Sequence, residues 1–372
     1  MPVRGTADLD RFIRVPLDCN RDDPNWIPPL LQERRAALDT KRNPYFEHAE
    51  AQYWIACKDG RPVGRISAQI DRLWLERYRD ATGHFGLIEG EDDPAIFSAL
   101  TATAEEWLRA KGMRRILGPF NLSTNEESGL IVDGFDTPPM LMMGHAKPHV
   151  AERLAEQGYQ KAKDLYAYMY DLHGSVPRNI QAALDRARRE KIVVRPLNKA
   201  AYRRDLSLAL EIFNEAWFNN WGFVPWTTTE IAHAADMMRP LIDERLVWFA
   251  EVDGAPAAMA IALPNINEAL ADLDGRLLPL GWLKLLWRLK VRGLKTARVP
   301  LMGVKRVYAQ GLTAKALPFL VLDSLRGAGL QLGYRHVELS WILEDNLPMR
   351  RIIEAFGGKP YKIYRVFEKS LA

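Results

Sequence analysis

Two stretches of the chain share one pattern: QYWIACKDGRPVGRISAQI at residues 52–70 and LVWFAEVDGAPAAMAIALP at residues 246–264. Each consists of an apolar run, an Asp-Gly pair and a second apolar run. An Asp-Gly pair between apolar runs predicts a β-hairpin. At an offset of 194 residues the same amino acid stands at five paired positions: Trp54 and Trp248, Ala56 and Ala250, Asp59 and Asp253, Gly60 and Gly254, Pro62 and Pro256.

A second match follows at an offset of 198 residues. In both places the sequence is typical of a helix, a glycine and a strand rich in tyrosine. The identical pairs are Arg153 and Arg351, Glu156 and Glu354, Lys161 and Lys359, and Tyr166 and Tyr364. The two matches together predict that the chain contains two copies of one domain.

Between these landmarks each copy carries a strand, an amphipathic helix and another strand. In the first copy we expect strands at 84–89 and 115–118, with a helix that Asp93 caps and Pro94 opens, running to about Lys111. In the second copy we expect strands at 298–304 and 336–342 and a helix over 316–332. This order predicts an α/β (α+β) fold with two tandem mixed sheets flanked by helices. The expected divisions are a first domain at 1–172, a charged linker helix at 173–192 and a second domain at 193–372.

Length and composition agree with two globular domains. The chain has 372 residues, of which 48% are hydrophobic and 26% charged, so global disorder is excluded. Two cysteines, Cys19 and Cys57, cannot form a disulfide scaffold and indicate a reducing compartment. Cys57 is expected to be a buried thiol within its strand. Since the first residues lack the apolar segment of a secretory signal, we expect a cytoplasmic protein.

Positive charge is concentrated in one part of the chain. The net charge is only +4, but residues 275–322 contain no acidic residue and ten basic ones. An anion is therefore the expected partner of this segment. The ten are Arg276, Lys284, Arg288, Lys290, Arg292, Lys295, Arg298, Lys305, Arg306 and Lys315.

The segment GVKRVYAQGLTAKAL, residues 303–317, resembles the acyl-CoA segment of the GNAT acyltransferases, where a strand leads into a glycine-rich loop that opens a helix. In that family, backbone amides of the loop and the helix start hold the CoA pyrophosphate, as helix N-termini favour anions. Thr313 and Lys315 stand where small residues are usual; either they add a hydroxyl and an ammonium to the phosphate site, or the loop has lost CoA. The resemblance implies a site of Gly303, Val304, Gln310, Gly311, Leu312, Thr313, Lys315 and Asn346, with acyl-CoA as co-substrate and no tightly bound cofactor.

The segment NLPMRRIIEAFGG, residues 346–358, is similar to a second GNAT helix, which starts at an Asn and carries a Tyr that commonly protonates the departing thiolate. This chain has Ile353 at the Tyr position, so another group or water must serve. The first copy has acidic residues at 89–93 in place of a phosphate loop, which predicts a degenerate copy that shapes the acceptor side.

The first half also resembles the long tandem GNAT-like proteins that include bacterial ceramide synthases, which transfer a fatty acyl group from an acyl thioester to the amine of a sphingoid base. The segments that carry this resemblance are DDPNWIPP at 22–29, NPYFEH at 43–48, GPFN at 118–121 and NEE at 125–127.

A long polar stretch without periodicity, residues 118–149, is the expected location of the catalytic groups, because long irregular segments are uncommon unless functional. Acyl transfer to an amine needs a general base. We expect Glu126 or His145 to be this base and Asn125 to orient the substrate; the alternative is that the acids cap turns and the histidines are ordinary loop residues. We expect no metal, since Pro148 interrupts a helical pairing of His145 with His149.

Residues 276–292, RLLPLGWLKLLWRLKVR, are typical of an interfacial helix with an apolar face, two tryptophans and basic residues. The alternative is a core helix whose basic face is solvated. As an interfacial helix it would place the protein peripherally on an anionic membrane and favour a long-chain substrate.

The function expected is that of an acyl-CoA-dependent N-acyltransferase acting on a lipid-like amine, with no DNA partner. Two alternatives remain: an aminoacyl-tRNA-dependent transferase of the peptidoglycan-bridge type, and a non-catalytic protein that retained the fold.

Overall fold

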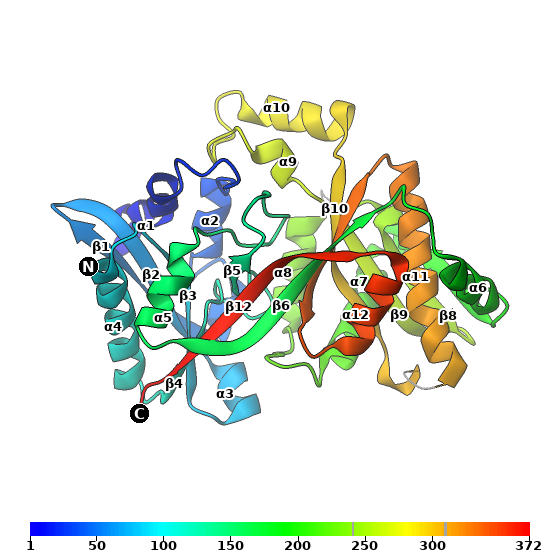
Figure 1. Ribbon diagram of the computed structural model, residues 1–372, viewed down its shortest axis with the longest axis horizontal. Helices are drawn as coiled ribbons and strands as arrows, with labels where there is room; N and C mark the ends of the chain where they lie inside the picture. Colours follow the sequence, from blue (N-terminus) through cyan, green and yellow to red (C-terminus); the bar gives the residue numbers. More distant parts are fainter. Residues whose placement is uncertain (240–241, 309–310) are drawn as a thin grey trace. The chain divides into compact units, whose positions relative to one another are not determined.

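The computed structural model describes residues 1–239, 242–308 and 311–372, with the side chains of 311–315 not described (Figure 1). The chain forms two compact units. Unit 1 comprises Met1–Leu165, Ala269–Trp287 and Lys362–Ala372, and unit 2 comprises Tyr166–Glu268 and Arg288–Tyr361. Two segments from the second half of the sequence, 269–287 and 362–372, therefore belong to unit 1.

Unit 1 is built on a mixed sheet with the order β1-β2-β3-β4, followed by the C-terminal part of β12. The pairing is antiparallel except between β3 and β4, which run parallel. Its strands are β1 (Ala49–Lys58), β2 (Arg61–Asp71), β3 (Thr82–Gly90), β4 (Arg115–Gly118), β5 (Leu130–Asp133), the first half of β6 (Gln160–Asp171) and, from Lys362 on, β12 (Lys359–Ser370).

Helices cover both faces of this sheet. Glycine at 64 lets α4 pack closely, because a Cβ there would lie 2.8 Å from Ile96 Cγ2. On the other face, Phe12 of α1 packs in a core with Tyr53, Ile55 and Leu87. The helices of unit 1 are α1 (Gly5–Cys19), α2 (Leu31–Ala37), α3 (Arg72–Tyr78), α4 (Pro94–Ala110), α5 (His149–Glu156), the second half of α9 (Asn267–Leu270) and α10 (Gly281–Trp287).

Unit 2 repeats the same arrangement in the order β7-β8-β9-β10-β11, with the second half of β6 beside β11. Strands β7, β8, β9 and β10 pair antiparallel in turn, and β10 pairs parallel with β11. Its elements are α6 (Arg178–Ala187), β7 (Ile192–Pro196), α7 (Tyr202–Trp217), α8 (Thr228–Met238), β8 (Val247–Val252), β9 (Ala255–Pro264), β10 (Thr296–Val304), α11 (Gly311–Gln331), β11 (His336–Leu343) and α12 (Leu347–Phe356).

Local sequence signals account for several of these boundaries. Both Asp-Gly hairpins form, β1–β2 and β8–β9, and Asp59 and Asp253 adopt the positive φ that such turns require. The carboxylate of Asp93 accepts a hydrogen bond from the backbone of Ala95 (2.9 Å) and starts α4, as predicted. The predicted mixed α/β fold, with helices flanking mixed sheets, is confirmed.

Two local expectations are wrong. Cys57 is exposed, because the register of β1 shifts at Ala56 and Cys57 next to the hairpin turn. The helix expected over 276–292 begins only at Gly281 and runs to Trp287, followed by a π-helical turn at Arg288–Arg292. Across the described residues, no helix has the length and apolarity needed to cross a bilayer.

Candidate functional site

The parallel strands β10 and β11 of unit 2 are paired over only part of their length. Pairing runs from Thr296 with His336 to Val299 with Leu339. Beyond this point β10 continues beside β9, with an irregular register between Arg298 and Leu301. A cleft of about 170 Å³ lies there, lined by the final residues of both strands. Backbone groups on the β10 edge facing the cleft are thereby available to an extended ligand.

Side chains from two helices complete this cleft. Trp217 of α7 donates its indole N–H to the carbonyl of Met302 (3.1 Å) and packs edge-to-face on Trp341. Glycine at 303 permits this close approach, because a Cβ there would lie 2.9 Å from the Cβ of Ala216. Asn346 lines the cleft and caps α12 by accepting a hydrogen bond from the backbone of Met349 (3.3 Å).

Of the residues predicted for CoA, Gly303, Val304 and Asn346 therefore lie together in one cleft. Gln310 falls outside the described residues. Gly311, Leu312, Thr313 and Lys315 belong to the first turn and a half of α11, whose backbone is described. The amides that open a 21-residue helix are the groups expected to receive a phosphate.

An apolar cavity of about 50 Å³ lies within unit 2 next to the cleft. Val299, Leu339 and Ile353 line both spaces. Ile353 is buried, so the position where a tyrosine was expected by resemblance presents an apolar side chain to both cavities. Arg326 donates a hydrogen bond to the hydroxyl of Tyr170 (3.1 Å), and both residues line the apolar cavity.

The basic segment 275–322 does not form one cationic surface. Arg298 is buried and lies 3.5 Å from the carboxylate of Glu338. Lys305 is also buried and forms an ion pair with Glu211. Lys284 pairs with Asp272. Three of the ten basic residues are therefore matched by carboxylates, and an anion as partner of the remaining ones stays a prediction.

In unit 1 the corresponding opening between β3 and β4 is filled by the chain itself. The strands pair only from Thr82 with Arg115 to His84 with Leu117. Beyond them the backbone N–H of Leu87 donates to Oδ1 of Asn121 (2.8 Å), and that of Phe120 donates to the carbonyl of Phe85 (2.8 Å). Loop residues occupy the space that is open in unit 2.

The structure separates the predicted catalytic residues. Asn125 and Glu126 lie in a turn at Ser123, whose Oγ accepts a hydrogen bond from the backbone of Asn125 (3.1 Å). Burial and the nearby Glu126 raise the pKa of Tyr53. His145 instead lines a polar cavity of about 40 Å³ that neither Asn125 nor Glu126 lines. Burial lowers the pKa of His145, against the opposing effect of Asp23, whose Oδ2 lies 2.8 Å from Nε2.

Sequence reasoning missed the charged groups around this cavity. Arg65 and Glu89 line it, with a guanidinium nitrogen 3.6 Å from Glu89 Oε2. Burial raises the pKa of Glu89 despite Arg65. Beside them Arg34 forms an ion pair with Glu127, which also accepts a hydrogen bond from Asn121 (2.7 Å). The available signal was Arg65 itself, a charged residue between apolar neighbours in the middle of β2.

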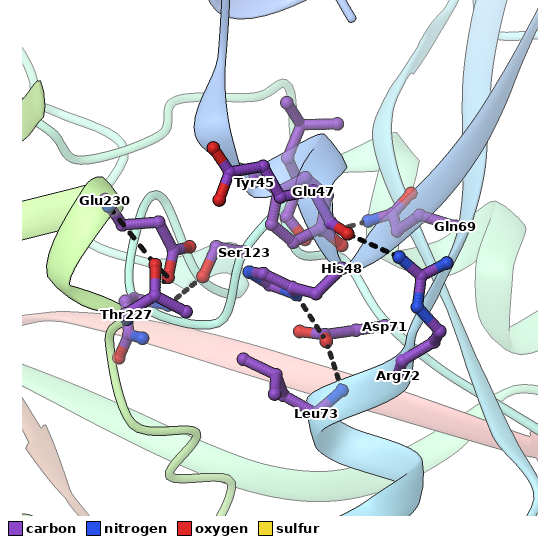
Figure 2. Close-up of polar contacts among 12 residues, drawn as sticks. Tyr45, Glu47, His48, Gln69, Asp71, Arg72, Leu73, Ser123, Thr227 and Glu230 are labelled. Carbon is purple, nitrogen blue, oxygen red and sulfur yellow. Dashed lines mark hydrogen bonds and ion pairs between the residues drawn. The ribbon is translucent and has the colours of Figure 1, made fainter.

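A second histidine–carboxylate pair lies elsewhere in unit 1 (Figure 2). His48 Nδ1 lies 2.9 Å from Oδ1 of Asp71, which also accepts a hydrogen bond from the backbone of Leu73 (2.9 Å) at the start of α3. Arg72 donates to the carbonyl of Glu47. These contacts join the segment before β1 to the end of β2, so Asp71 has a structural role as the cap of α3.

No group of three or more His, Cys, Asp or Glu side chains within the described part of the chain is arranged to hold a metal ion.

Comparison with known proteins gives full-length matches. The chain is 50% identical over 372 residues to the bacterial ceramide synthase of Caulobacter vibrioides, covering 100% of this chain and 97% of that protein. It is 45% identical over 365 residues to Protein YghO of Escherichia coli, covering 98% and 93%. Among solved structures, a tandem GNAT protein from the clavulanic acid biosynthesis pathway superposes with a TM-score of 0.56 at 14% identity, covering 100% and 98%. No family model matches.

Proposed function

Because this chain belongs to the family of the bacterial ceramide synthase, we propose that it transfers a long-chain acyl group from acyl-CoA to the amine of a sphingoid base. Membership of this family confirms the expected class of enzyme, an N-acyltransferase. In the proposed reaction the amine nitrogen attacks the thioester carbonyl, a C–N bond forms and the C–S bond breaks. Before the attack the ammonium loses one proton to a base, and the nitrogen loses a second proton to solvent as the amide forms; the CoA thiolate gains one proton from water.

The cleft between β10 and β11 is the observation that carries this proposal. A pantetheine arm is an extended chain with amide groups, so it can pair with an exposed strand edge as a peptide does. Gly303 and Val304 supply that edge, and α11 begins only seven residues after the end of β10. The arm would then run toward the helix start, where free backbone amides favour the pyrophosphate.

The apolar cavity beside the cleft, about 50 Å³ in volume, has room for the first few methylene groups of an acyl chain. It shares Ile353, Val299 and Leu339 with the cleft, so an acyl chain leaving the thioester meets apolar side chains there. Burying methylene groups contributes roughly 0.8 kcal/mol each. Ile353 cannot donate a proton, so water would protonate the leaving thiolate.

Exposure of α10 supports delivery of a lipid substrate from a membrane. None of its residues is buried, and Trp282 and Trp287 are 46% and 53% exposed. This arrangement does not fit a core helix. An apolar helix with tryptophans and a basic neighbourhood is suited to the surface of an anionic bilayer.

Direct binding of palmitoyl-CoA tests the donor site. Asn220→Trp places a bulky ring at a residue that lines the cleft, whereas Asn219→Trp, its exposed neighbour, does not line it. We expect palmitoyl-CoA to raise the melting temperature of the wild type and of Asn219→Trp, and to have a much smaller effect on Asn220→Trp. Equal stabilisation of both variants would place the donor elsewhere.

A further inference from the structure

We propose that unit 1 holds the acceptor: the polar cavity lined by Arg65, Glu89 and His145 receives the amine and an adjacent hydroxyl, and the neighbouring open groove receives the alkyl chain. This inference rests on the proposed function, because it identifies where an amphipathic amine would bind. It assigns the head group to a site that lies wholly inside unit 1.

The cavity contains polar atoms that lack protein partners. Arg65 is 7% exposed and His145 is 9% exposed. The Nε atom of Arg65, the Oε2 atom of Glu89 and the Nδ1 atom of His145 are all buried without a hydrogen-bond partner. Buried polar atoms normally find partners, so three unsatisfied atoms around one cavity indicate a ligand or ordered water. A volume of about 40 Å³ has room for two or three water-sized groups, such as one ammonium and one hydroxyl.

Glu89 is the group in the cavity that is suited to a cation. Of the lining residues, Glu89 carries a carboxylate and Arg65 a guanidinium group. Arg34 and Glu127 also act on Glu89, and Lys362 acts on His145. Burial raises the pKa of Glu89 despite both arginines. An ammonium bound beside Glu89 would favour the charged form of this carboxylate.

The pair of Asp23 and His145 connects the cavity to the groove. His145 lines the cavity and Asp23 lines the groove, and their side chains are hydrogen bonded at 2.8 Å. The groove is open, has a volume of about 900 Å³ and lies between residues 17–28 and 271–284. Leu278 and Leu280 are 79% and 68% exposed at its edge, next to α10. The lining also contains charged residues: Arg21, Asp272, Asp274, Arg276 and Lys284. An alkyl chain would lie along the leucines of this mixed groove, with its head group in the cavity.

His145 is suited to take a proton from the bound ammonium. A neutral ring that donates Nε2–H to Asp23 carries its lone pair on Nδ1, which faces no protein donor. Burial lowers the pKa of His145 and keeps the ring neutral near pH 7. Transfer of one proton from the ammonium to Nδ1 leaves a neutral amine and an imidazolium that Asp23 stabilises.

Binding of a medium-chain 2-amino-1,3-diol, measured by calorimetry without acyl-CoA, tests this site. We expect Glu89→Gln to weaken binding by about tenfold or more, because the amide lacks the negative charge. Glu91→Gln is the matched control: Glu91 is exposed, pairs with Arg61 and does not line the cavity. In the wild type, the same diol without its amine should bind at least about tenfold more weakly.

The two proposals fail separately. If Glu89→Gln and Glu91→Gln bind the amine as tightly as the wild type, or if the diol without an amine binds equally well, the acceptor site is not this cavity, whatever happens with palmitoyl-CoA. If the amine binds with the expected pattern while palmitoyl-CoA neither binds nor reacts, the acceptor site stands and the proposed transfer reaction does not. The diol with and without its amine is compared on the wild-type protein. This comparison decides the result even if a variant fails to fold.

Discussion

Nε2 of His145 lies 2.8 Å from Oδ2 of Asp23, a residue 122 positions earlier in the chain. The side chain of His145 is almost completely buried and that of Asp23 is 16% exposed. The carboxylate fixes the orientation of the ring, and Nδ1 is buried without a hydrogen-bond partner. This relationship ties an N-terminal segment to the long polar loop and is the basis on which we propose His145 as the general base.

Replacing Asp23 with Asn should therefore slow acyl transfer. The amide cannot stabilise the imidazolium as a carboxylate does, and we expect kcat to fall by at least about tenfold. Asp22→Asn is the control, because Asp22 is largely exposed and pairs with Lys147 at the surface. Steady-state rates of both variants check this; equal rates would remove Asp23 from the mechanism.

The pH dependence of the reaction also tests His145 as the general base. Burial lowers the pKa of His145 below the ordinary histidine value of about 6.5. The base must be unprotonated to act. As the pH is lowered, kcat/KM should therefore stay constant to about pH 6.5 and fall only below it. Asp23→Asn should move the fall to still lower pH, because the carboxylate favours the charged ring. A fall centred above pH 7 would point to a different base.

Stability should also depend on pH, through His84. This histidine is completely buried between Trp74 and Phe120, and burial lowers its pKa to about 4. The unfolded chain therefore binds a proton near pH 6.5, while the folded protein binds it only near pH 4. Lowering the pH from 6.5 to 4 should therefore decrease the free energy of unfolding by about 3 kcal/mol through His84. Denaturant melts of His84→Gln should show a smaller loss over this range than wild type; an identical loss would contradict the assignment.

Closure of the opening in unit 1 depends on a glycine. A Cβ on Gly86 would lie 1.8 Å from the carbonyl oxygen of Phe120. Gly86→Ala should therefore lower the free energy of unfolding by more than about 3 kcal/mol, because backbone must move. Gly327→Ala is the control, since a Cβ there meets nothing within 4 Å and lies in α11. It should be neutral or stabilise by up to about 1 kcal/mol; similar effects of the two changes in urea melts would argue against a filled opening.

Membrane association can be measured by sedimentation with liposomes. Trp282 and Trp287 are exposed on α10, so replacing both with Ala should reduce binding to anionic vesicles by about tenfold or more. Trp54→Phe, in the buried core of unit 1, is a control that leaves this surface intact. If the wild-type protein stays in the supernatant with anionic vesicles at low salt, it does not bind such a membrane and this role of α10 is contradicted.

Local signals predicted the fold well. The repeated Asp-Gly hairpins, the cap at Asp93 and the parallel strand after each central helix all depend on residues close together in sequence. Gly303, Val304 and Asn346 come from two separate motifs that a family resemblance brought together, and the structure places them in one cleft.

What the sequence did not reveal depends on long-range contacts. Pairing of Arg65 with Glu89 requires the register of β2 against β3, and the ion pair of Arg298 with Glu338 requires that of β10 against β11. Charges at such positions look like surface charges when the sequence is read alone. The cavity around His145 was missed for the same reason, because its walls come from segments spread over 81 positions, from Arg65 to Ala146.

The most direct test of the account is release of free CoA from palmitoyl-CoA by the purified protein, followed with a thiol reagent, together with the mass of the lipid product. The account predicts thiol release that requires a long-chain 2-amino-1,3-diol and yields its N-palmitoyl amide, with strong loss in Asn220→Trp and Glu89→Gln and full activity in Asn219→Trp and Glu91→Gln. Thiol release that is independent of the amine, or the absence of an amide product at saturating concentrations of both substrates, would contradict it.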